Sequence, residues 1–242
     1  MLLISPHIDD AFLSLQSFIV DSSVRNQIVN VFSFSNFSLS NISLPNEVSL
    51  LRKKEEMKIA SYFGNVDVLF LDLPDCLLRG YTTPWISDTK QILSKEKFLI
   101  DKLYHLIFNI KYDGLMLFPL SVANHVDHII CQIVGNKFLD KGFEVGFYLE
   151  IPYKFKVNFN VFPKPFMNTQ KTLLFSEKEI VRKSYSSQFN PSNILGFYGE
   201  TITQMVDLGH DPTISEEIYY FDTNFWVDSC WKKGVNRGQI FI

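Results

Sequence analysis

Several protein classes need features that this sequence of 242 residues lacks. Its three cysteines are an odd number without metal-site spacing, which favours a reducing compartment over a disulfide framework. No apolar run approaches the roughly eighteen residues that a membrane span requires. With 23 Lys and Arg against 26 Asp and Glu, the net charge of -3 offers no basic surface for nucleic acid. No glycine-rich phosphate loop supports dinucleotide or ATP binding.

Two further absences concern targeting and organisation. The first apolar run begins at residue 2 without a basic segment before it, so we expect no secretory signal and a cytoplasmic location. No internal repeat, low-complexity tract or linker divides the chain, and residues 1–242 are predicted to form a single domain. The content of 46% hydrophobic and 20% charged residues suits a domain with a sizeable core. The oligomeric state stays open.

What the chain does contain is an alternation of short apolar runs and helical patterns. The run 2–4 reads as a buried strand, and apolar residues from Asp10 onward recur at helical spacing. The alternation continues, with strands expected at 28–34, 65–71, 115–118 and 143–151 and helices at 47–63, 95–109 and 125–138. Strands separated by such helices form βαβ units, so the predicted fold is α/β and Rossmann-like, a mostly parallel sheet flanked by helices.

The last third is less regular. Residues 153–165 alternate aromatic and polar side chains, which suggests extended segments or an antiparallel addition. Ser176 and Glu179 resemble a capping box that opens a helix to about residue 187. Short extra strands are expected at 216–221 and 238–242. In the predicted helix 47–63, the apolar positions are Leu50, Leu51, Met57, Ile59, Ala60 and Phe63.

Polar residues gather where the first strand ends. His7, Asp9 and Asp10 follow the apolar run directly, and ligands of open parallel sheets bind outside the carboxyl ends of the strands. A plainer interpretation is equally good for this cluster alone, because Asp-Asp can simply cap the helix and His7 can be a solvated loop residue.

A second cluster has the same layout. The strand that ends near Pro119 is followed by His125, Asp127 and His128 and then by a helical apolar run. Two strand ends of one sheet can bring both clusters into a single crevice. Imidazole nitrogens and carboxylate oxygens are ligands that zinc accepts, and a catalytic zinc keeps an open position for water. Iron and other first-row metals suit the same ligands. Chemistry alone does not choose between Asp9 and Asp10, or between His125 and His128.

These residues carry a resemblance to a family. Ser5-Pro6-His7-Ile8-Asp9-Asp10, with Leu13-Ser14 behind it, is similar to the first signature of the PIG-L/LmbE-like deacetylases, and His125-Val126-Asp127-His128 is similar to their second. Arg52-Lys53-Lys54-Glu55, Leu73-Pro74-Asp75 and Tyr185-Ser186-Ser187-Gln188 resemble further elements of that family in the same order. Ile8 replaces a usual proline, and Gln16-Ser17 stand where the family often has two glycines.

The resemblance implies an LmbE-like fold and a zinc-dependent hydrolase. It implies His7, Asp10 and His128 as zinc ligands and Asp9 as the general base. It also implies that His125 stabilises the oxyanion, with Asp127 holding that imidazole in its charged form.

The implied reaction removes the N-acetyl group from an amino sugar, usually a glucosamine within a glycoconjugate or natural-product precursor, and gives the free amine and acetate. Arg52 and Asp75 match positions that hydrogen-bond sugar hydroxyls, although from the residues alone a solvated arginine and a turn aspartate explain them better. Glu150 either reaches the pocket or is a surface carboxylate at a strand end. The alternatives are hydrolysis of another N-acyl group or of a phosphoester, and a non-catalytic sugar-binding module.

Overall fold

The computed structural model describes residues 1–21, 25–35, 44–86, 90–121, 124–150, 166–174, 184–187 and 214–222. Within them lies one seven-stranded sheet in the order β3-β2-β1-β4-β5-β7-β6. Its parallel part comprises β1 (Leu2–Ser5), β2 (Asn26–Asn30), β3 (Val66–Phe70), β4 (Met116–Pro119) and β5 (Val145–Tyr148). Strands β7 (Ile214–Asp222) and β6 (Phe166–Leu174) extend the β5 edge in antiparallel fashion. The predicted α/β class with a mostly parallel sheet is confirmed.

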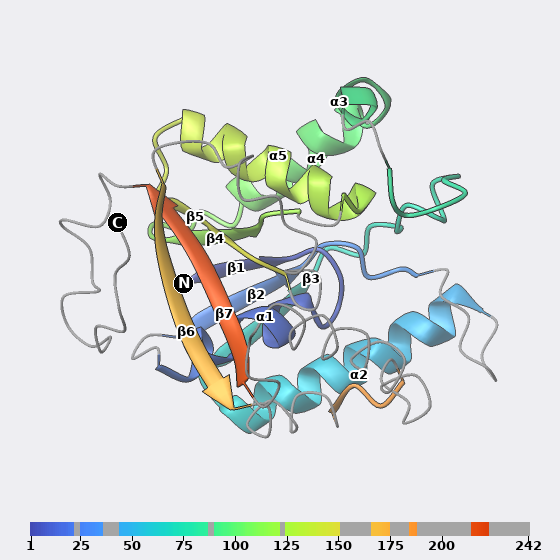
Figure 1. Ribbon diagram of the computed structural model, residues 1–242. Coiled ribbons are helices and arrows are strands. Elements are labelled where there is room, and N and C mark those ends of the chain that lie inside the picture. Colours follow the sequence, from blue (N-terminus) through green and yellow to red (C-terminus); the bar gives the residue numbers. More distant parts are fainter. Residues whose placement is uncertain are drawn as a thin grey trace.

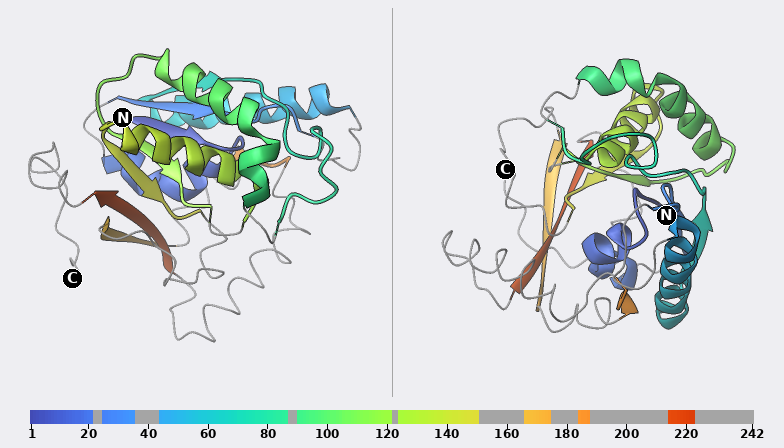
Figure 2. Two further views of the ribbon diagram at one scale, coloured as in Figure 1. Left: turned by 90° about the horizontal axis from the view of Figure 1, so that it is seen from above. Right: turned by 90° about the vertical axis from the view of Figure 1, so that its right-hand side faces the viewer.

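Helices cover both faces of the parallel sheet (Figure 1). One face carries α3 (Lys90–Lys95), α4 (Lys97–Phe108) and α5 (Val126–Asp140), and the other carries α1 (Asp10–Asp21) and α2 (Pro45–Phe63). Figure 2 shows the same layers from two further directions, with β6 and β7 at the edge of the sheet away from α2. No helix in the described part of the chain is long and apolar enough to cross a membrane.

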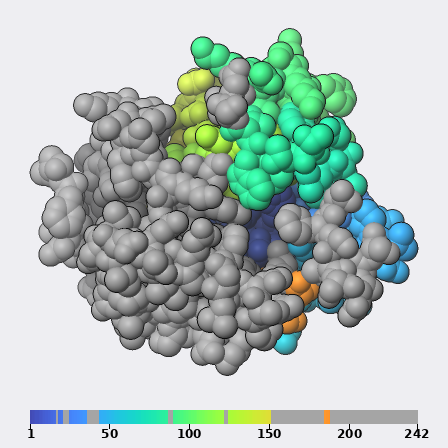
Figure 3. Space-filling model, turned by 45° about the vertical axis from the view of Figure 1, so that its right-hand side comes forward, coloured from blue at the N-terminus to red at the C-terminus, as the bar shows by residue number. Residues whose placement is uncertain are grey.

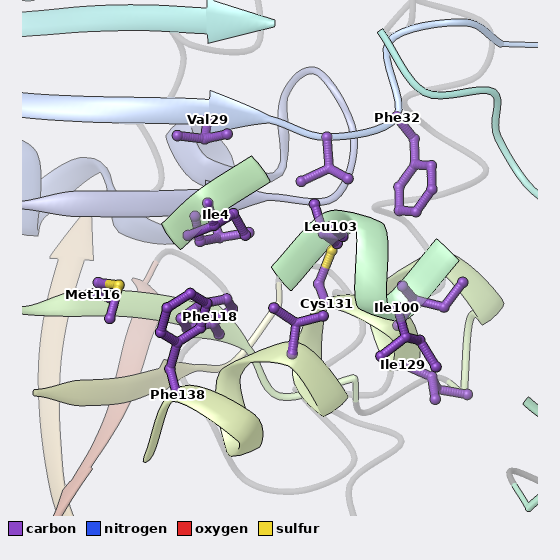
Figure 4. Close-up of a cluster of buried hydrophobic side chains, with 14 of the residues drawn as sticks. Ile4, Val29, Phe32, Ile100, Leu103, Met116, Phe118, Ile129, Cys131 and Phe138 are labelled. Atoms are coloured by element: carbon purple, nitrogen blue, oxygen red, sulfur yellow. The ribbon is translucent and has the colours of Figure 1, made fainter. Parts of the chain in front are cut away.

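Alternation along the strands divides the core into two layers. Leu2 and Ile4 pack under α3, α4 and α5, whereas Leu3 between them packs under α1 and α2. Side chains of successive strand residues point to opposite faces, so a buried strand must be apolar throughout. Figure 4 shows the first layer, in which Phe118 lies beside Phe138.

Helix α5 lies close against β4 because Gly135 has no side chain. A β-carbon at Gly135 would come within 2.7 Å of the Phe118 ring, which is fully buried. This close approach fixes the start of α5 relative to the end of β4. The sequence cluster at residues 125–128 is therefore held at the carboxyl edge of the sheet.

Two helix predictions need correction. The helix expected at 95–109 is α4, and the short helix α3, which ends just before Glu96, was not expected. On α2, Leu50 and Met57 were expected to be apolar core positions, but they are 59% and 51% exposed. Ile59 and Ala60 are buried as expected, but the inward side of the helix also buries the charged residues Arg52, Glu55 and Glu56.

The last third is described only in part. The expected strand at 216–221 lies within β7, and β6 supplies an antiparallel strand just after the alternating stretch. Of the expected helix ending near residue 187, only 184–187 are described. The predictions for 153–165 and 238–242 lie outside the described residues.

Candidate active site

The loop after β1 is held by its own polar side chains. The Ser5 hydroxyl donates to the carbonyl of His7 at 2.6 Å and accepts from the Ala11 amide at 3.0 Å. Asp10 Oδ2 accepts from the His7 amide at 2.9 Å, which closes the loop onto the first residue of α1. Asp9 has a φ of 123°, a conformation that L residues rarely adopt and that costs about 1–3 kcal/mol. The strain at Asp9 marks this loop as a functional candidate.

Three donor atoms from the two sequence clusters form a tight triangle. His128 Nε2 lies 3.3 Å from His7 Nδ1 and 3.3 Å from Asp10 Oδ2, and His7 Nδ1 lies 3.5 Å from Asp10 Oδ2. Tetrahedral zinc with bonds of about 2.0–2.1 Å has ligand atoms roughly 3.3 Å apart. The expected meeting of the two loops is thus observed, and this donor set fits a metal ion.

A carboxylate engages the other nitrogen of each of these two histidines. Asp127 Oδ2 lies 2.9 Å from His7 Nε2, and Glu150 Oε1 lies 2.9 Å from His128 Nδ1. An ionised carboxylate only accepts, so these nitrogens carry the protons and leave His7 Nδ1 and His128 Nε2 as bases facing Asp10. Carboxylates that orient metal-binding histidines in this way are typical of zinc sites.

The electrostatics of the cluster favour a cation. Burial lowers the pKa of His7 and of His128, but hydrogen bonds and charge from Asp10, Asp127 and Glu150 outweigh it and raise these pKa values to about 9 and about 10. Burial alone would raise the pKa of Asp10, yet the two imidazoles hold it well below its usual range. The carboxylates that stabilise protons on the histidines would equally stabilise a metal ion there.

Asp127 serves a different histidine from the one expected. Its carboxylate bonds to His7 Nε2, to the Cys76 amide at 3.1 Å and to Arg79 Nη2 at 2.7 Å. Arg79 also donates to Glu96 Oε1 at 3.2 Å. Asp127 therefore orients His7 and is itself anchored by a half-buried guanidinium.

His125 is the N-cap of α5 and is held in its neutral form. Its Nδ1 accepts from the Asp127 backbone amide at 3.2 Å, so the ring proton lies on Nε2. Burial and repulsion from His7 and His128 lower the pKa of His125 to about 2. The expectation that Asp127 keeps this imidazole charged is wrong in this structure, because the Asp127 carboxylate is turned towards His7 and Arg79. A neutral Nε2–H can still donate a hydrogen bond.

Asp9 and Asp10 differ in their electrostatic surroundings. Burial and the neighbouring Asp10 charge raise the pKa of Asp9 well above its usual value, while Arg52 and His7 oppose the rise. Arg52 is buried on α2, where its Nη1 donates to Ser35 Oγ at 3.4 Å and where it feels the charges of Asp9 and Asp75. Asp75 is buried and accepts from the Leu78 amide at 3.0 Å. Arg52 thus lies close to Asp9 and to Asp75, the other predicted substrate residue.

Behind Arg52, two acidic residues of α2 hold the segment 184–187. Glu55 accepts from the Ser187 amide at 2.7 Å and from the Ser186 hydroxyl at 3.2 Å. The Tyr185 hydroxyl donates to Glu56, which also accepts from Asn30 Nδ2 at 2.9 Å. These bonds explain why a helix on the outside of the sheet buries so many charges.

The site opens to the surface beside an aromatic side chain. Trp85 is 46% exposed, and its ring meets the His125 ring edge to face at 6.2 Å between centroids. Backbone bonds from Val126 to Pro84 and from Ile86 to Asn124 hold the two segments together. In Figure 3 the deep-blue N-terminal segment lies recessed between the green segment and the orange residues 184–187.

Among the described residues, two other sets of potential metal ligands lie close together, and the set with a cysteine is less suited to bind a metal ion than the His7, Asp10 and His128 set. Donor atoms of His7, His125 and His128 come within 4.8 Å of one another, as do those of Cys76, His125 and Asp127. In the second set, burial and the charges of Asp127 and Asp75 raise the pKa of the Cys76 thiol, and thiols bind metals as thiolates. The Asp127 carboxylate is also already engaged by Arg79.

Sequence reasoning missed Arg79, Glu96 and Trp85 as parts of the site. Arg79 and Trp85 lie in the irregular segment after β3, and Glu96 lies between two helices, where no periodicity points inward. The one signal available was that residues following a parallel strand reach the ligand-binding edge. The alternative for Glu150 is decided, since it is buried against His128.

Comparisons with known proteins identify the family and the fold. The family model described as GlcNAc-PI de-N-acetylase matches residues 2–138. No curated protein matches the chain. A deacetylase of the teicoplanin biosynthesis pathway aligns with a TM-score of 0.63 at 19% identity, over 90% of this chain and 96% of its own.

Two other solved structures share the fold. The A40926 pseudoaglycone deacetylase Dbv21 aligns with a TM-score of 0.62 at 16% identity, over 91% of this chain and 95% of its own. The N,N'-diacetylchitobiose deacetylase of Pyrococcus horikoshii aligns with a TM-score of 0.50 at 16% identity, over 89% of this chain and 82% of its own. The family match covers more than half of the chain, including both polar clusters, and the chain belongs to the PIG-L family of GlcNAc-PI de-N-acetylases.

Proposed function

We propose that this protein is a zinc-dependent deacetylase that hydrolyses the N-acetyl group of an amino sugar. Membership of the PIG-L family supports amino-sugar N-deacetylation. The observation that carries the metal is the triangle of His7 Nδ1, Asp10 Oδ2 and His128 Nε2, with edges of 3.3 to 3.5 Å. When bound, the zinc ion supplies Lewis acidity, which polarises the amide carbonyl and lowers the pKa of water towards about 7. Iron remains the alternative metal for the same ligands.

Asp9 is the proposed general base. Its raised pKa suits a carboxylate that accepts a proton from the attacking water and later delivers it to the leaving amine. The water oxygen bonds to the carbonyl carbon, the C–N bond breaks, and acetate and the free amine leave. The pKa of the adjacent Asp10 is lowered instead, which suits the two carboxylates to different roles.

His125 is the proposed oxyanion donor. Since its Nδ1 accepts the Asp127 amide, its Nε2–H is free to donate to the carbonyl oxygen as negative charge develops there. This donation needs no protonated imidazole. Asp127 contributes by orienting His7, and we place it among the residues that support the metal ligands.

Arg52 and Asp75 are proposed to bind the hydroxyl groups of the sugar, because Arg52 lies close enough to both Asp9 and Asp75 to interact with their charges. The structural neighbours are named as deacetylases of teicoplanin biosynthesis, of A40926 pseudoaglycone and of N,N'-diacetylchitobiose. An N-acetylglucosamine-type glycoconjugate or natural-product precursor is therefore the proposed substrate class. The proposal treats 1–242 as one domain acting in the cytoplasm, where the buried thiols of Cys76 and Cys131 stay reduced.

The test is metal analysis of the purified protein followed by an acetate-release assay on N-acetylglucosaminides. We expect about one divalent metal per chain, loss of activity with a chelator and recovery on adding zinc. Protein that binds no metal and releases no acetate would refute the proposal. A parallel series of longer N-acyl glucosaminides tests the acyl alternative, and sugar binding without acetate release would support the binding-module alternative.

A further inference from the structure

Glu150 lies two residues after β5, where it contacts Ser121 in the segment after β4 and His128 on α5. It is 1% exposed, and its Oε1 accepts from the Ser121 amide at 2.7 Å and lies 2.9 Å from His128 Nδ1. The Ser121 bond fixes the position of Oε1, because a backbone amide cannot rotate away from it. The carboxylate is thus aimed at one nitrogen of one proposed metal ligand.

The two carboxylates behind the histidines differ in their own surroundings. Asp127 shares its charge between His7 and Arg79, whose Nη2 lies 2.7 Å from Oδ1. In the part of the chain that the structure describes, Glu150 Oε2 is buried without a hydrogen-bond partner, and the one ion pair of Glu150 is with His128. A buried carboxylate without a second cation directs its full charge at the imidazole it contacts.

We infer that Glu150 is a positioning residue that holds His128 in the Nδ1–H tautomer and strengthens Nε2 as a metal donor. The inference rests on the proposed function, because it takes His128 as a ligand. In the other tautomer Nε2 carries the proton and cannot bind a metal. Partners of this kind typically change metal affinity by about 10- to 100-fold when they are removed.

The experiment measures zinc affinity by competition with a chelator in the wild-type protein and in Glu150→Gln. The glutamine keeps the shape of the side chain, and its carbonyl oxygen can still accept from Ser121, so the fold is preserved while the charge is lost. We expect a dissociation constant about 10- to 100-fold weaker with unchanged stoichiometry. Glu144→Gln is the matched control, since Glu144 is exposed just before the same strand. It should bind zinc as the wild type does.

A second measurement tests the tautomer directly. In the zinc-loaded protein, nitrogen-15 NMR of the histidine rings should show a proton on Nδ1 of His128, and Glu150→Gln should reduce its protection from exchange with water. Wild-type affinity in Glu150→Gln, with unchanged exchange at Nδ1, would overturn the inference and leave the proposed function standing. A wild-type protein that binds no zinc would overturn both.

Discussion

Glu56 should make the stability of this protein fall as the pH rises from about 4.5 to about 7. The side chain is fully buried, and burial raises its pKa to about 7, although Tyr185 and Asn30 donate to it and oppose the rise. Between the ordinary value of 4.5 and about 7, the folded state binds this proton and the unfolded state does not. The contribution of Glu56 to stability therefore decreases with pH in that window and becomes level above it. The raised pKa corresponds to about 3 kcal/mol.

The assay is urea unfolding followed by circular dichroism at several pH values from 4.5 to 8. Glu56→Gln cannot ionise. As the pH rises from 4.5 to 7.5, the free energy of unfolding of Glu56→Gln should therefore increase by about 3 kcal/mol relative to that of the wild type. Carboxylates that do not interact with Glu56 titrate equally in both proteins and cancel in the difference. Glu47→Gln, at the exposed start of the same helix, should follow the wild type throughout. Parallel curves for wild type and Glu56→Gln would refute the reasoning.

Three predictions concern the site itself. Asp9→Ala should retain its metal and lose at least about 100-fold in turnover, the scale of general-base catalysis, whereas Asp10→Ala should lose the metal; equal metal loss in both would contradict these roles. His125→Ala should lower turnover by roughly 100- to 1,000-fold at full metal content, and near-normal turnover would place the oxyanion donor elsewhere. Trp85→Ala should raise KM for an N-acetylglucosaminide more than it lowers kcat, because the exposed ring adjoins His125. Phe98→Ala, at an 83% exposed position on α4, should leave both constants unchanged.

The sequence predicted the sheet well because its strands are buried on both sides. A run such as 2–4 must be apolar at every position when alternate residues enter different core layers, and this makes the strand visible without knowledge of its neighbours. The polar clusters at residues 7–10 and 125–128 were visible for the same reason, since each interrupts an apolar pattern at the carboxyl end of a strand.

The inward face of α2 could not be predicted in the same way. Apolar spacing selected Leu50 and Met57 as core residues, although both are exposed. The residues that turn inward include Glu55 and Glu56, which are satisfied by a segment some 130 positions later in the chain. A polar residue is buried only when a partner meets it, and a single sequence does not reveal a partner at that separation.

The spacing His-x-Asp-His has a physical explanation in the first turn of α5. The first histidine precedes the helix as its N-cap, and its ring accepts the amide of Asp127 two positions on. Asp127 and His128 then leave the helix on neighbouring sides, and both reach His7, one at Nε2 and the other at Nδ1. One helical turn therefore contacts both ring nitrogens of His7 in the loop after β1, and His7 Nδ1 also faces Asp10. Because Gly135 allows α5 to sit directly on Phe118, the position of this turn is set by close packing two turns away. The geometry of the proposed metal ligands therefore depends on a helix–strand contact that contains no polar atom.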